Sequence, residues 1–514
     1  MRTSRGPWLL AGVAAGVAGL ATSYFVAMAM TIRESPVVAV AELVIRLTPG
    51  AVAEWAIELL GTADKPFLVA MVLLITLGLF AYAGRLAARA WWAPAIVYGA
   101  LAAFGAVAVM VQRGAAAADL LPVAVGFVTW LITLSLLTEP MRRAVAAEQA
   151  GTAEPTLGAS TRRSVLIRGA VITTVAATAA VVGQVVGRGR RHVEETRRLL
   201  RLNGTTPAVV PAEVRVGVEG VSPWMTPNAD FYRIHTAIVV PTIEPVNWQL
   251  RIHGMVDREL VISYEELVAR RFTESWITLN CVSNPVGGPL IGNAWWSGVR
   301  IADLLAEVGV HPDADAVLQT SEDGWTCGTP LAAMTDGRDA LLAVAMNGEP
   351  LPIDHGFPVR TIVPGLYGYV SATKWVVDYE VTRFDRIEAY WTQRGWGERG
   401  PVKMSSRVEV PRSGAEVLAG EVRVGGTAWA QHTGIRAVEV AVDGGAWQPA
   451  EVGGAPSDDT WVQWAATVTV EPGDHVVRVR AIDKTGRVQT GVEQDVLPDG
   501  ATGWHARDFT ATKA

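Results

Sequence analysis

Cysteine is almost absent from this chain, which has two Cys among 514 residues, at positions 281 and 327. Cys281 lies in TLNCVSN, between polar neighbours. A thiolate there could serve as a soft metal ligand or as a nucleophile. The alternative, and the more common role of a lone cysteine, is that of a small buried hydrophobe. The choice between these roles depends on the segments around it.

Histidine is missing from the first 191 residues, and all eight His come after the last long apolar run. This excludes bis-histidine haem ligation between the N-terminal helices. The soluble half has no Gly-rich phosphate loop before a helix, so a nucleotide cofactor is not indicated. No iron–sulfur motif is present either, so we expect electrons to pass to a separate carrier. The eight positions are His192, His235, His253, His311, His355, His432, His475 and His505.

Charge is scarce in the first part of the chain, up to about Gly187, which is rich in Ala, Val and Leu. Five apolar runs are long enough to cross about 30 Å of hydrocarbon as helices. We therefore predict a transmembrane region over residues 1–190 that contacts membrane lipid. The expected spans are Pro7 to Met30, Pro66 to Gly84, Trp91 to Val111, Ala115 to Leu137 and Gly169 to Val186.

Between the first two runs, the stretch from Glu34 to Asp64 has charged residues among apolar ones at helical spacing. This pattern is typical of a helix that lies at the membrane interface. An ordinary extramembrane loop that contains a helix fits the same residues.

Basic residues indicate the orientation of the spans. With five spans, most of the basic residues between them fall on one side, which predicts that this side is cytoplasmic and that the soluble half is outside the plasma membrane. The basic stretch Arg188 to Arg201 opposes this assignment. Arg162 and Arg163 precede the fifth run and look like an internal twin-arginine export signal. Simple positive-inside anchoring is the alternative.

The remainder of the chain predicts a linker and two domains. Residues 191–229 contain turns, and residues 230–400 mix short β-like runs with short helical ones, which favours an α+β domain. Residues 401–514 alternate apolar and polar residues between turns such as Asp443-Gly444-Gly445, which predicts an Ig-like β-sandwich. The fold class is therefore multidomain, with a transmembrane helical bundle, an α+β domain and a sandwich.

Several segments resemble one family in their order and spacing. FYRIHTAIVVP and WQLRIHGMV come first, then TLNCVSN and GNAWWSGVRIADLL, and then MNGEPLPIDHGFPVRTIVPGLYGYVSATKW. Together they are similar to the molybdopterin-binding domain of the sulfite oxidase family, over roughly Phe231 to Arg407. The tail resembles that family's molybdenum-cofactor dimerisation domain, which implies a possible homodimer through residues 401–514. The membrane part is not covered.

The resemblance implies a role for particular residues. Cys281 falls on the family's metal-ligating cysteine, and a thiolate suits molybdenum, which also takes two dithiolene sulfurs from the pterin. Five further residues match family positions that hold the cofactor, where Arg gives bidentate contacts to phosphate and Lys a point charge. They are Arg233, His235, His355, Arg360 and Lys374. Asn280 and Asn284 flank Cys281 and could orient it, or could simply form turns.

The remaining residues of interest are assigned to packing. Trp295 and Trp296 are expected to pack in the interior. Lys403 and Arg407 lie where the chain leaves the cofactor domain, which favours an interdomain contact. Cys327 is expected to be a free buried thiol, because a disulfide with Cys281 would remove the metal ligand.

Two departures from the family concern the substrate. Val286 stands where sulfite oxidases have an arginine, and Val344 stands where they have a tyrosine. Desolvating a small dianion without a cation is costly, so sulfite is doubtful. We therefore predict a membrane-anchored molybdopterin oxidoreductase, with one Mo per chain, that performs two-electron oxo transfer on a small sulfur- or nitrogen-containing substrate. A cofactor-binding or assembly module without turnover is the alternative. No nucleic-acid partner is expected.

Overall fold

A computed structural model describes residues 6–30, 32, 34–149, 167 and 189–513. The chain divides into two compact units. The first contains the residues up to Val193 and the short stretch Ala237–Thr242, and the second contains Glu194–Thr236 and Ile243–Ala514. The fifth expected span, Gly169 to Val186, and the arginine pair at 162 and 163 lie outside the described residues.

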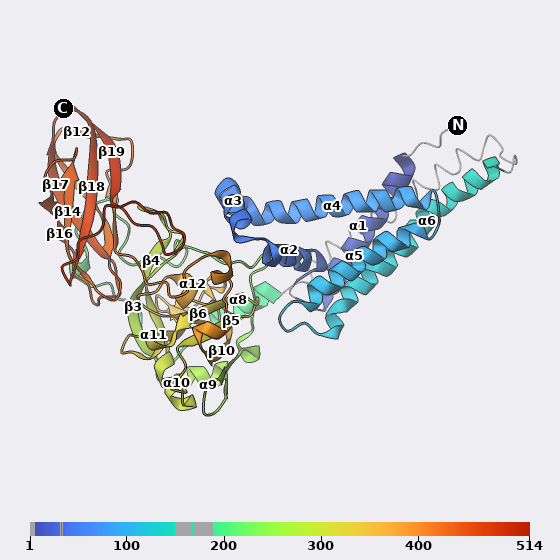
Figure 1. Ribbon diagram of the computed structural model, residues 1–514, viewed down its shortest axis with the longest axis horizontal. Coiled ribbons are helices and arrows are strands. Elements are labelled where there is room, and N and C mark those ends of the chain that lie inside the picture. Colours follow the sequence, from blue (N-terminus) through green and yellow to red (C-terminus); the bar gives the residue numbers. More distant parts are fainter. Residues whose placement is uncertain (1–5, 31, 33, 150–166, 168–188, 514) are drawn as a thin grey trace. The chain divides into compact units, whose positions relative to one another are not determined.

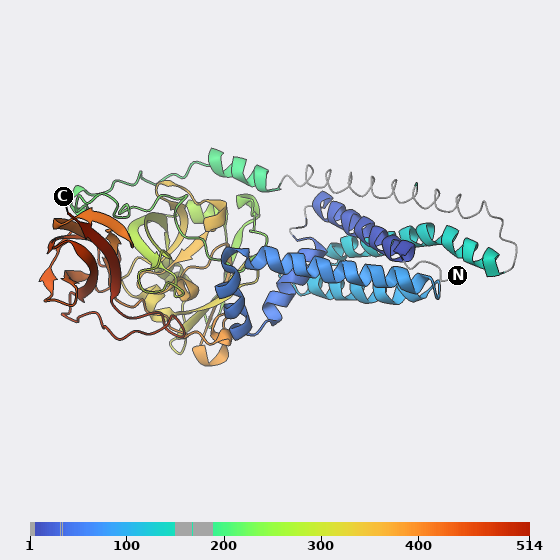
Figure 2. The ribbon, with the colours of Figure 1, turned by 90° about the horizontal axis from the view of Figure 1, so that it is seen from above.

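The first unit is helical (Figures 1 and 2). Four of its helical segments are long and apolar enough to cross a membrane, which confirms helices at four of the five expected runs. They are α1 (Gly6–Ala29), α4 (Asp64–Ala87), α5 (Ala93–Met110) and the stretch Ala117–Ala147, most of which is α6 (Leu121–Gln149).

Small residues let these helices approach closely. A Cβ added to Gly12 of α1 would lie 2.1 Å from the carbonyl oxygen of Phe80 in α4, so the two backbones touch there. On α6, Trp130 donates from its ring nitrogen to the carbonyl oxygen of Gly16 at 3.0 Å. Phe80, Tyr98 and Trp130 form an aromatic cluster at the centre of the bundle. Close approach of helix backbones at small residues, with side chains from neighbouring helices packed beside them, is typical of helix packing within membranes.

The stretch from Glu34 to Asp64 forms two helices, α2 (Pro36–Leu47) and α3 (Gly50–Leu60). Glu42 is buried, and its carboxylate accepts a hydrogen bond from the backbone of Ile238, in the short stretch that belongs to this unit. Arg46 donates to the carbonyl oxygen of Val111, just beyond α5. The charged residues of α2 therefore make specific contacts inside the unit.

Helix α8 (Gly189–Leu199) crosses from the first unit into the second, which starts at Glu194. The first part of the second unit contains one mixed sheet, one antiparallel sheet and short helices. One sheet has the strand order β2-β1-β10-β5-β6. Its strands are β1 (Gln249–Gly254), β2 (Leu260–Ser263), β5 (Ala316–Ser321), β6 (Thr326–Pro330) and β10 (Val376–Thr382). The other has the order β3-β4-β7-β8, with β9 paired to β7. Its strands are β3 (Thr273–Asn280), β4 (Ile291–Arg300), β7 (Leu341–Met346), β8 (Glu349–Pro350) and β9 (Arg360–Ile362).

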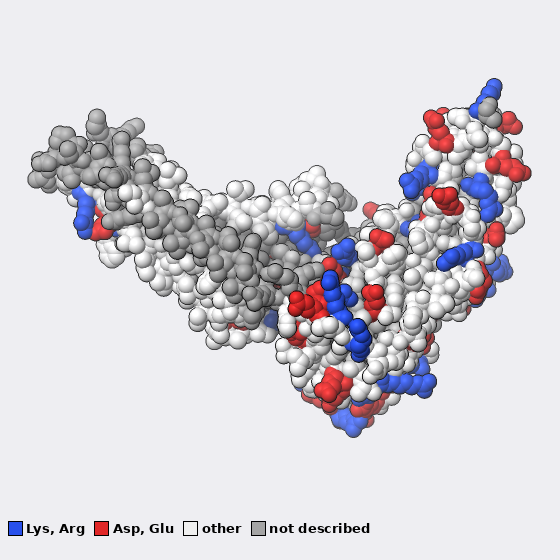
Figure 3. Space-filling model, turned by 180° about the vertical axis from the view of Figure 1, so that it is seen from behind, with Lys and Arg blue, Asp and Glu red and all other residues white. Residues whose placement is uncertain are grey.

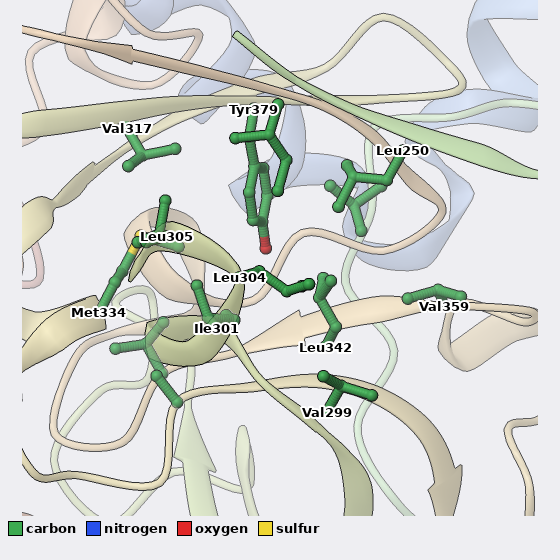
Figure 4. Close-up of a cluster of buried hydrophobic side chains, with 14 of the residues drawn as sticks. Leu250, Val299, Ile301, Leu304, Leu305, Val317, Met334, Leu342, Val359 and Tyr379 are labelled. Atoms are coloured by element: carbon green, nitrogen blue, oxygen red, sulfur yellow. The ribbon is translucent and has the colours of Figure 1, made fainter. Parts of the chain in front are cut away.

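A large apolar core lies between these elements (Figure 4). Helix α10 (Ile301–Val308) shows why the sequence folds this way. Its apolar residues Ile301, Leu304, Leu305 and Val308 are spaced along one helical face, and all four are buried. Gly309 ends the helix with a φ of 69°. Helices α9 (Tyr264–Val268), α11 (Leu331–Thr335) and α12 (Gly368–Ser371) are shorter.

The last part of the chain forms two further sheets with a core of their own. One has the order β11-β13-β17-β16 and the other the order β12-β19-β18-β14-β15. The strands are β11 (Ser405–Val410), β12 (Ala415–Leu418), β13 (Gly420–Trp429), β14 (Ile435–Val442), β15 (Gln448–Pro449), β16 (Glu451–Val452), β17 (Val462–Val470), β18 (Gly473–Asp483) and β19 (His505–Thr512). Residues 405–512, which form these sheets, are called the C-terminal β region below.

Charge is distributed unequally along the chain. From Glu194 onward there are 28 Lys and Arg against 41 Asp and Glu, so this part of the chain is acidic. On the face in Figure 3, side chains of both signs are interspersed over the second unit. An acidic surface favours small cations and basic partners over anions.

Candidate active site around Cys281

Cys281 directly follows β3 and opens the loop that leads to β4. Its backbone nitrogen donates to the carbonyl oxygen of Leu290 at 3.0 Å, and the Asn284 side chain accepts from the nitrogen of Leu290 at 2.8 Å. Asn284 therefore holds the loop closed. This is the turn-forming role, one of the two roles that the sequence allowed for this residue. Residues 281–290 are called the Cys281 loop below.

The surroundings of the thiol act on its ionisation in opposite directions. Burial raises the pKa of Cys281. Hydrogen bonds from Ser283 and the positive charge of Lys374 lower the pKa. Because burial is the largest effect, the thiol without a metal is held neutral, whereas a bound cation would favour the thiolate.

His355, Arg360 and Lys374 are brought together by one continuous stretch of chain. The two terminal nitrogens of Arg360 donate to the carbonyl oxygens of His355 at 3.0 Å and Ala372 at 3.2 Å. Lys374 donates to the carbonyl oxygen of Asp354 at 2.9 Å. Backbone carbonyls thus position two cations beside one imidazole.

Arg233 and His235 join this group from the segment that precedes β1. Arg233 pairs with the Asp354 carboxylate at 3.3 Å, although 51% of its side chain is exposed. The His235 ring packs edge-on against Trp375, with 5.7 Å between ring centroids. All five residues that the family resemblance assigned to the cofactor therefore lie in one connected region.

Arg360 is a buried cation, with 4% of its surface exposed. Burial lowers its pKa to about 10, so it keeps its charge at neutral pH. Within residues 189–513, no carboxylate forms an ion pair with it. A buried charge without a counter-ion is expensive, so this position calls for an anionic ligand. The phosphate of a pterin cofactor has the required charge.

His355 is held neutral. Its Nε2 donates to the carbonyl oxygen of Asn228 at 3.0 Å, which leaves Nδ1 as an acceptor. Burial lowers the pKa of His355 to about 3, and the charges of Lys374 and Arg360 act in the same direction. The imidazole can therefore accept a hydrogen bond from a ligand but does not add charge.

Several buried polar atoms near this group lack a hydrogen-bond partner among the described residues. They are Asn280 Oδ1, His355 Nδ1 and Arg360 Nε. Leaving such an atom unpaired costs about 1–3 kcal/mol. The set contains both donors and acceptors, which is what a pterin ring with both kinds of group would satisfy. The residues present thus fit a molybdopterin cofactor.

The metal itself would take few ligands from the chain. Among the described residues, no group of three or more His, Cys, Asp or Glu side chains is placed to hold a metal ion. A metal at Cys281 would therefore depend on ligands from a cofactor, as dithiolene sulfurs would provide.

The opposite side of the Cys281 loop is covered by the C-terminal β region. Arg407 is buried and donates to the carbonyl oxygen of Gly288 at 2.8 Å and to Ser222 at 3.3 Å. Its guanidinium also pairs with Glu409 at 2.6 Å. Arg407, which was expected at a domain boundary, thus joins the C-terminal β region to the Cys281 loop.

His505, at the start of β19, touches the same loop. A Cβ added to Gly287 would lie 2.1 Å from its Nε2, and Gly287 has a φ of 76°. Its Nδ1 accepts from the nitrogen of Val408 at 2.9 Å, and burial lowers the pKa of His505 to about 4. A neutral imidazole is therefore packed directly against the loop.

The other assignments from the sequence concern packing. Both cysteines are free, and Cys327 is buried between the hydroxyls of Thr329 and Thr373. Trp296 is fully buried beneath Arg360, 5.2 Å from the guanidinium to the ring centroid. Val344 belongs to the apolar core, whereas Val286 is half-buried on the Cys281 loop. Of the two valines, only Val286 lies on the Cys281 loop.

Sequence reasoning did not single out Tyr232, Tyr367 or His505. Burial raises the pKa values of both tyrosines, and a thiolate at Cys281 would raise them further. Tyr232 directly precedes Arg233, so the assignment of Arg233 to the cofactor could have drawn attention to Tyr232. Tyr367 and His505 are far from Cys281 in the sequence, and no local pattern marks them.

Known proteins resemble the second unit. The family model described as an oxidoreductase molybdopterin binding domain matches residues 237–391. Uncharacterized oxidoreductase YuiH from Bacillus subtilis (strain 168) is 34% identical, over 35% of this chain and 87% of that protein. Sulfite oxidase from Gallus gallus is 31% identical, over 56% of this chain and 72% of that protein.

Among solved structures, the sulfane dehydrogenase SoxCD from Paracoccus pantotrophus is 25% identical. The superposition covers 53% of this chain and 75% of the SoxCD chain, with a TM-score of 0.47.

Proposed function

Because the chain belongs to the sulfite oxidase family of molybdopterin-dependent oxidoreductases, we propose that it transfers an oxo group between a small sulfur or nitrogen compound and a molybdenum held at Cys281. The buried cation Arg360, which has no carboxylate counter-ion among the described residues, carries this proposal. It calls for an anionic cofactor beside the loop that begins with Cys281.

Each residue of the site has a role in this proposal. Cys281 supplies the thiolate ligand. Arg360 and Lys374 bind the phosphate and nearby polar groups, and neutral His355 accepts a hydrogen bond from the pterin. Arg233 and His235 complete the rim. When bound, the cofactor supplies the two-electron chemistry at the metal.

The substrate class follows from Val286, which provides no cation for a dianion. A sulfoxide or an amine N-oxide fits better than sulfite. Reduction of a sulfoxide consumes two electrons and two protons and yields the sulfide and water. A separate electron carrier supplies those electrons in this direction and accepts electrons in the reverse direction.

In this proposal, the N-terminal unit anchors the oxidoreductase in the membrane. Helices α1, α4, α5 and α6 are compatible with membrane insertion. The basic residues favour a plasma-membrane location with the second unit on the extracytoplasmic side, and Arg162 and Arg163 favour export of a folded, cofactor-loaded protein. We assign the two sheets of the C-terminal β region to an Ig-like sandwich that mediates dimerisation and also covers the Cys281 loop.

Two matched cysteine variants test the proposal. Cys281→Ser should lower turnover more than about 100-fold, since even changes beyond the ligands cost 10–100-fold at metal sites. Cys327→Ser should keep both activity and molybdenum, because its hydroxyl fits between Thr329 and Thr373. Metal analysis and reoxidation of the reduced protein by sulfoxides, N-oxides, sulfite and nitrate give the readout. Unaltered molybdenum redox behaviour in Cys281→Ser would show that the ligand lies elsewhere.

A further inference from the structure

The buried face of the sheet that contains β5 has polar residues at positions where a core is normally apolar. Tyr379 of β10, Gln319 of β5 and Cys327 of β6 are direct partners across three neighbouring strands, so their side chains project from the same face. All three are fully buried, and the Tyr379 ring lies within the apolar core (Figure 4). Ser321 and Thr329 add two further buried hydroxyls from β5 and β6. Buried polar groups are costly unless they are hydrogen-bonded, so the partners of these residues are informative.

The hydrogen bonds on this face form a chain with one direction. The Thr361 hydroxyl donates to Gln319 Oε1 at 2.6 Å. The Tyr379 hydroxyl, 2.6 Å from the Thr361 oxygen, must therefore donate to that oxygen. Gln319 Nε2 donates to the Thr329 oxygen at 2.6 Å, and the Thr329 hydroxyl donates to the carbonyl oxygen of Val370 at 2.6 Å. Both threonines thus accept one hydrogen bond and donate one, and the bonds of such a chain strengthen each other.

This chain ends on the segment that carries the cations assigned to the cofactor. Thr361 directly follows Arg360 in β9, and successive side chains of a strand point to opposite faces. Val370 is in α12, two residues before Ala372, whose carbonyl oxygen accepts from the Arg360 guanidinium. The chain therefore holds both the strand from which Arg360 projects and the helix next to the carbonyl that receives it.

Lys374 is held from the same sheet. The Ser321 hydroxyl donates to the carbonyl oxygen of Lys374 at 2.8 Å, and the Thr373 hydroxyl lies 3.2 Å from the Cys327 sulfur. The backbone nitrogen of Thr361 donates to the carbonyl oxygen of Thr373 at 2.8 Å, which joins the two ends of the segment. Both cations thus extend from a backbone that buried side chains of β5 and β6 fix from behind.

The segment has little regular structure with which to hold itself. Within residues 360–374, β9 has three residues and α12 has four. Irregular backbone that is free to move must be ordered when a ligand binds, which lowers affinity. Gln319 limits this motion because it bonds to Thr361 at one end of the segment and, through Thr329, to Val370 near the other.

We propose that Gln319 and Thr361 are positioning residues for the cofactor: the buried chain that they form fixes Arg360 and Lys374 relative to each other and so determines how firmly the anionic part of the cofactor is held. This inference rests on the proposed function, which places the cofactor beside these cations. Gln319 and Thr361 lie behind the cations, on the side of the apolar core, so the inference concerns retention of the cofactor rather than turnover.

The first test compares two buried glutamines in the full chain, purified in detergent with its cofactor. Gln319→Leu removes the central link of the chain. Gln463→Leu is the matched control, because Gln463 of the C-terminal β region also makes two hydrogen bonds, with Ser222 and Val216. Released pterin, measured by its fluorescence after oxidation, should appear about three- to tenfold faster from Gln319→Leu than from the wild-type protein, and at the wild-type rate from Gln463→Leu. Equal release from the two variants overturns the inference, since a merely structural loss would affect both alike.

A second pair of variants changes less of the core and decides the question even if Gln319→Leu does not fold. Thr361→Val keeps the shape of the side chain but leaves the Tyr379 hydroxyl without its acceptor and Gln319 Oε1 without its donor. Pterin release should accelerate about three- to tenfold here too. Thr361→Ser restores the hydroxyl and should return release close to the wild-type rate. If Thr361→Ser releases pterin as fast as Thr361→Val, the hydroxyl does not hold the segment and the inference fails.

The wild-type protein separates this inference from the proposed function. If the wild-type protein contains pterin and molybdenum, and Gln319→Leu and Thr361→Val retain pterin equally well, the positioning role is overturned while the oxidoreductase stays in place. Wild-type protein without pterin, from a host that makes the cofactor, would contradict the proposed function and this inference together.

Discussion

The two sides of Cys281 are built differently. On the cofactor side, Asp354 to Lys374 is one stretch of chain whose cations are held by its own backbone carbonyls. On the other side, which the proposed function makes the entrance side, residues from distant segments meet: His505 packs against Gly287 of the Cys281 loop, and Gly503 lies beside Val286. Under the proposed function, cofactor binding would thus depend on a local segment, whereas the substrate environment would depend on how the C-terminal β region packs.

This difference indicates where change is tolerated. A segment that binds the cofactor must keep its cations and its orphaned polar atoms together. A side assembled from several segments, such as the one that carries Val286, should tolerate substitution without loss of the cofactor. The two sides should therefore respond separately to substitution.

The largest effect is expected on the cofactor side, from Arg360→Lys. A lysine has one nitrogen and cannot reach the carbonyls of His355 and Ala372 while also contacting a phosphate. We expect the pterin and molybdenum content of the purified protein to fall about tenfold or more. Arg383→Lys is the control, because Arg383 pairs with Asp385 on the surface. Full cofactor content in Arg360→Lys would break the comparison, since the cofactor side would then not depend on its buried guanidinium.

A smaller effect is expected on the entrance side, from Arg407→Met. The change leaves Glu409 buried without its partner, which costs about 3–5 kcal/mol of stability. The double variant Arg407→Met, Glu409→Met should recover most of this loss, because it removes both charges. Thermal unfolding of the full chain in detergent measures both. Cofactor content should stay unchanged in these variants, and a parallel loss of molybdenum would show that the two sides are coupled.

The sequence predicted the cofactor side better than the entrance side for a physical reason. Arg360 and Lys374 are close along the chain, so a pattern of Gly, Pro and His positions could reveal them. Long apolar runs likewise predicted α1 and α4, because membrane-spanning length is a local property.

Contacts between distant segments left no such pattern. His505 is separated from Cys281 by 224 positions, and its contact with the Cys281 loop depends on Gly287, which leaves room for the imidazole ring. Glu42 is buried and accepts a hydrogen bond from the backbone of Ile238, a partner that the spacing of charged residues in its own segment does not reveal. Such contacts follow from tertiary packing, which one sequence does not display.

The smallest effect, and the sharpest comparison, comes from two glycines with nearly the same backbone. Gly287 has a φ of 76° and Gly444 a φ of 74°, but only Gly287 meets a neighbour, the ring of His505. Gly444→Ala should cost about 1 kcal/mol from the left-handed conformation alone. Gly287→Ala should add about 1–3 kcal/mol for the clash and raise KM by displacing the Cys281 loop. Equal losses of stability, with KM unchanged, would mean that the C-terminal β region does not set the geometry of the entrance.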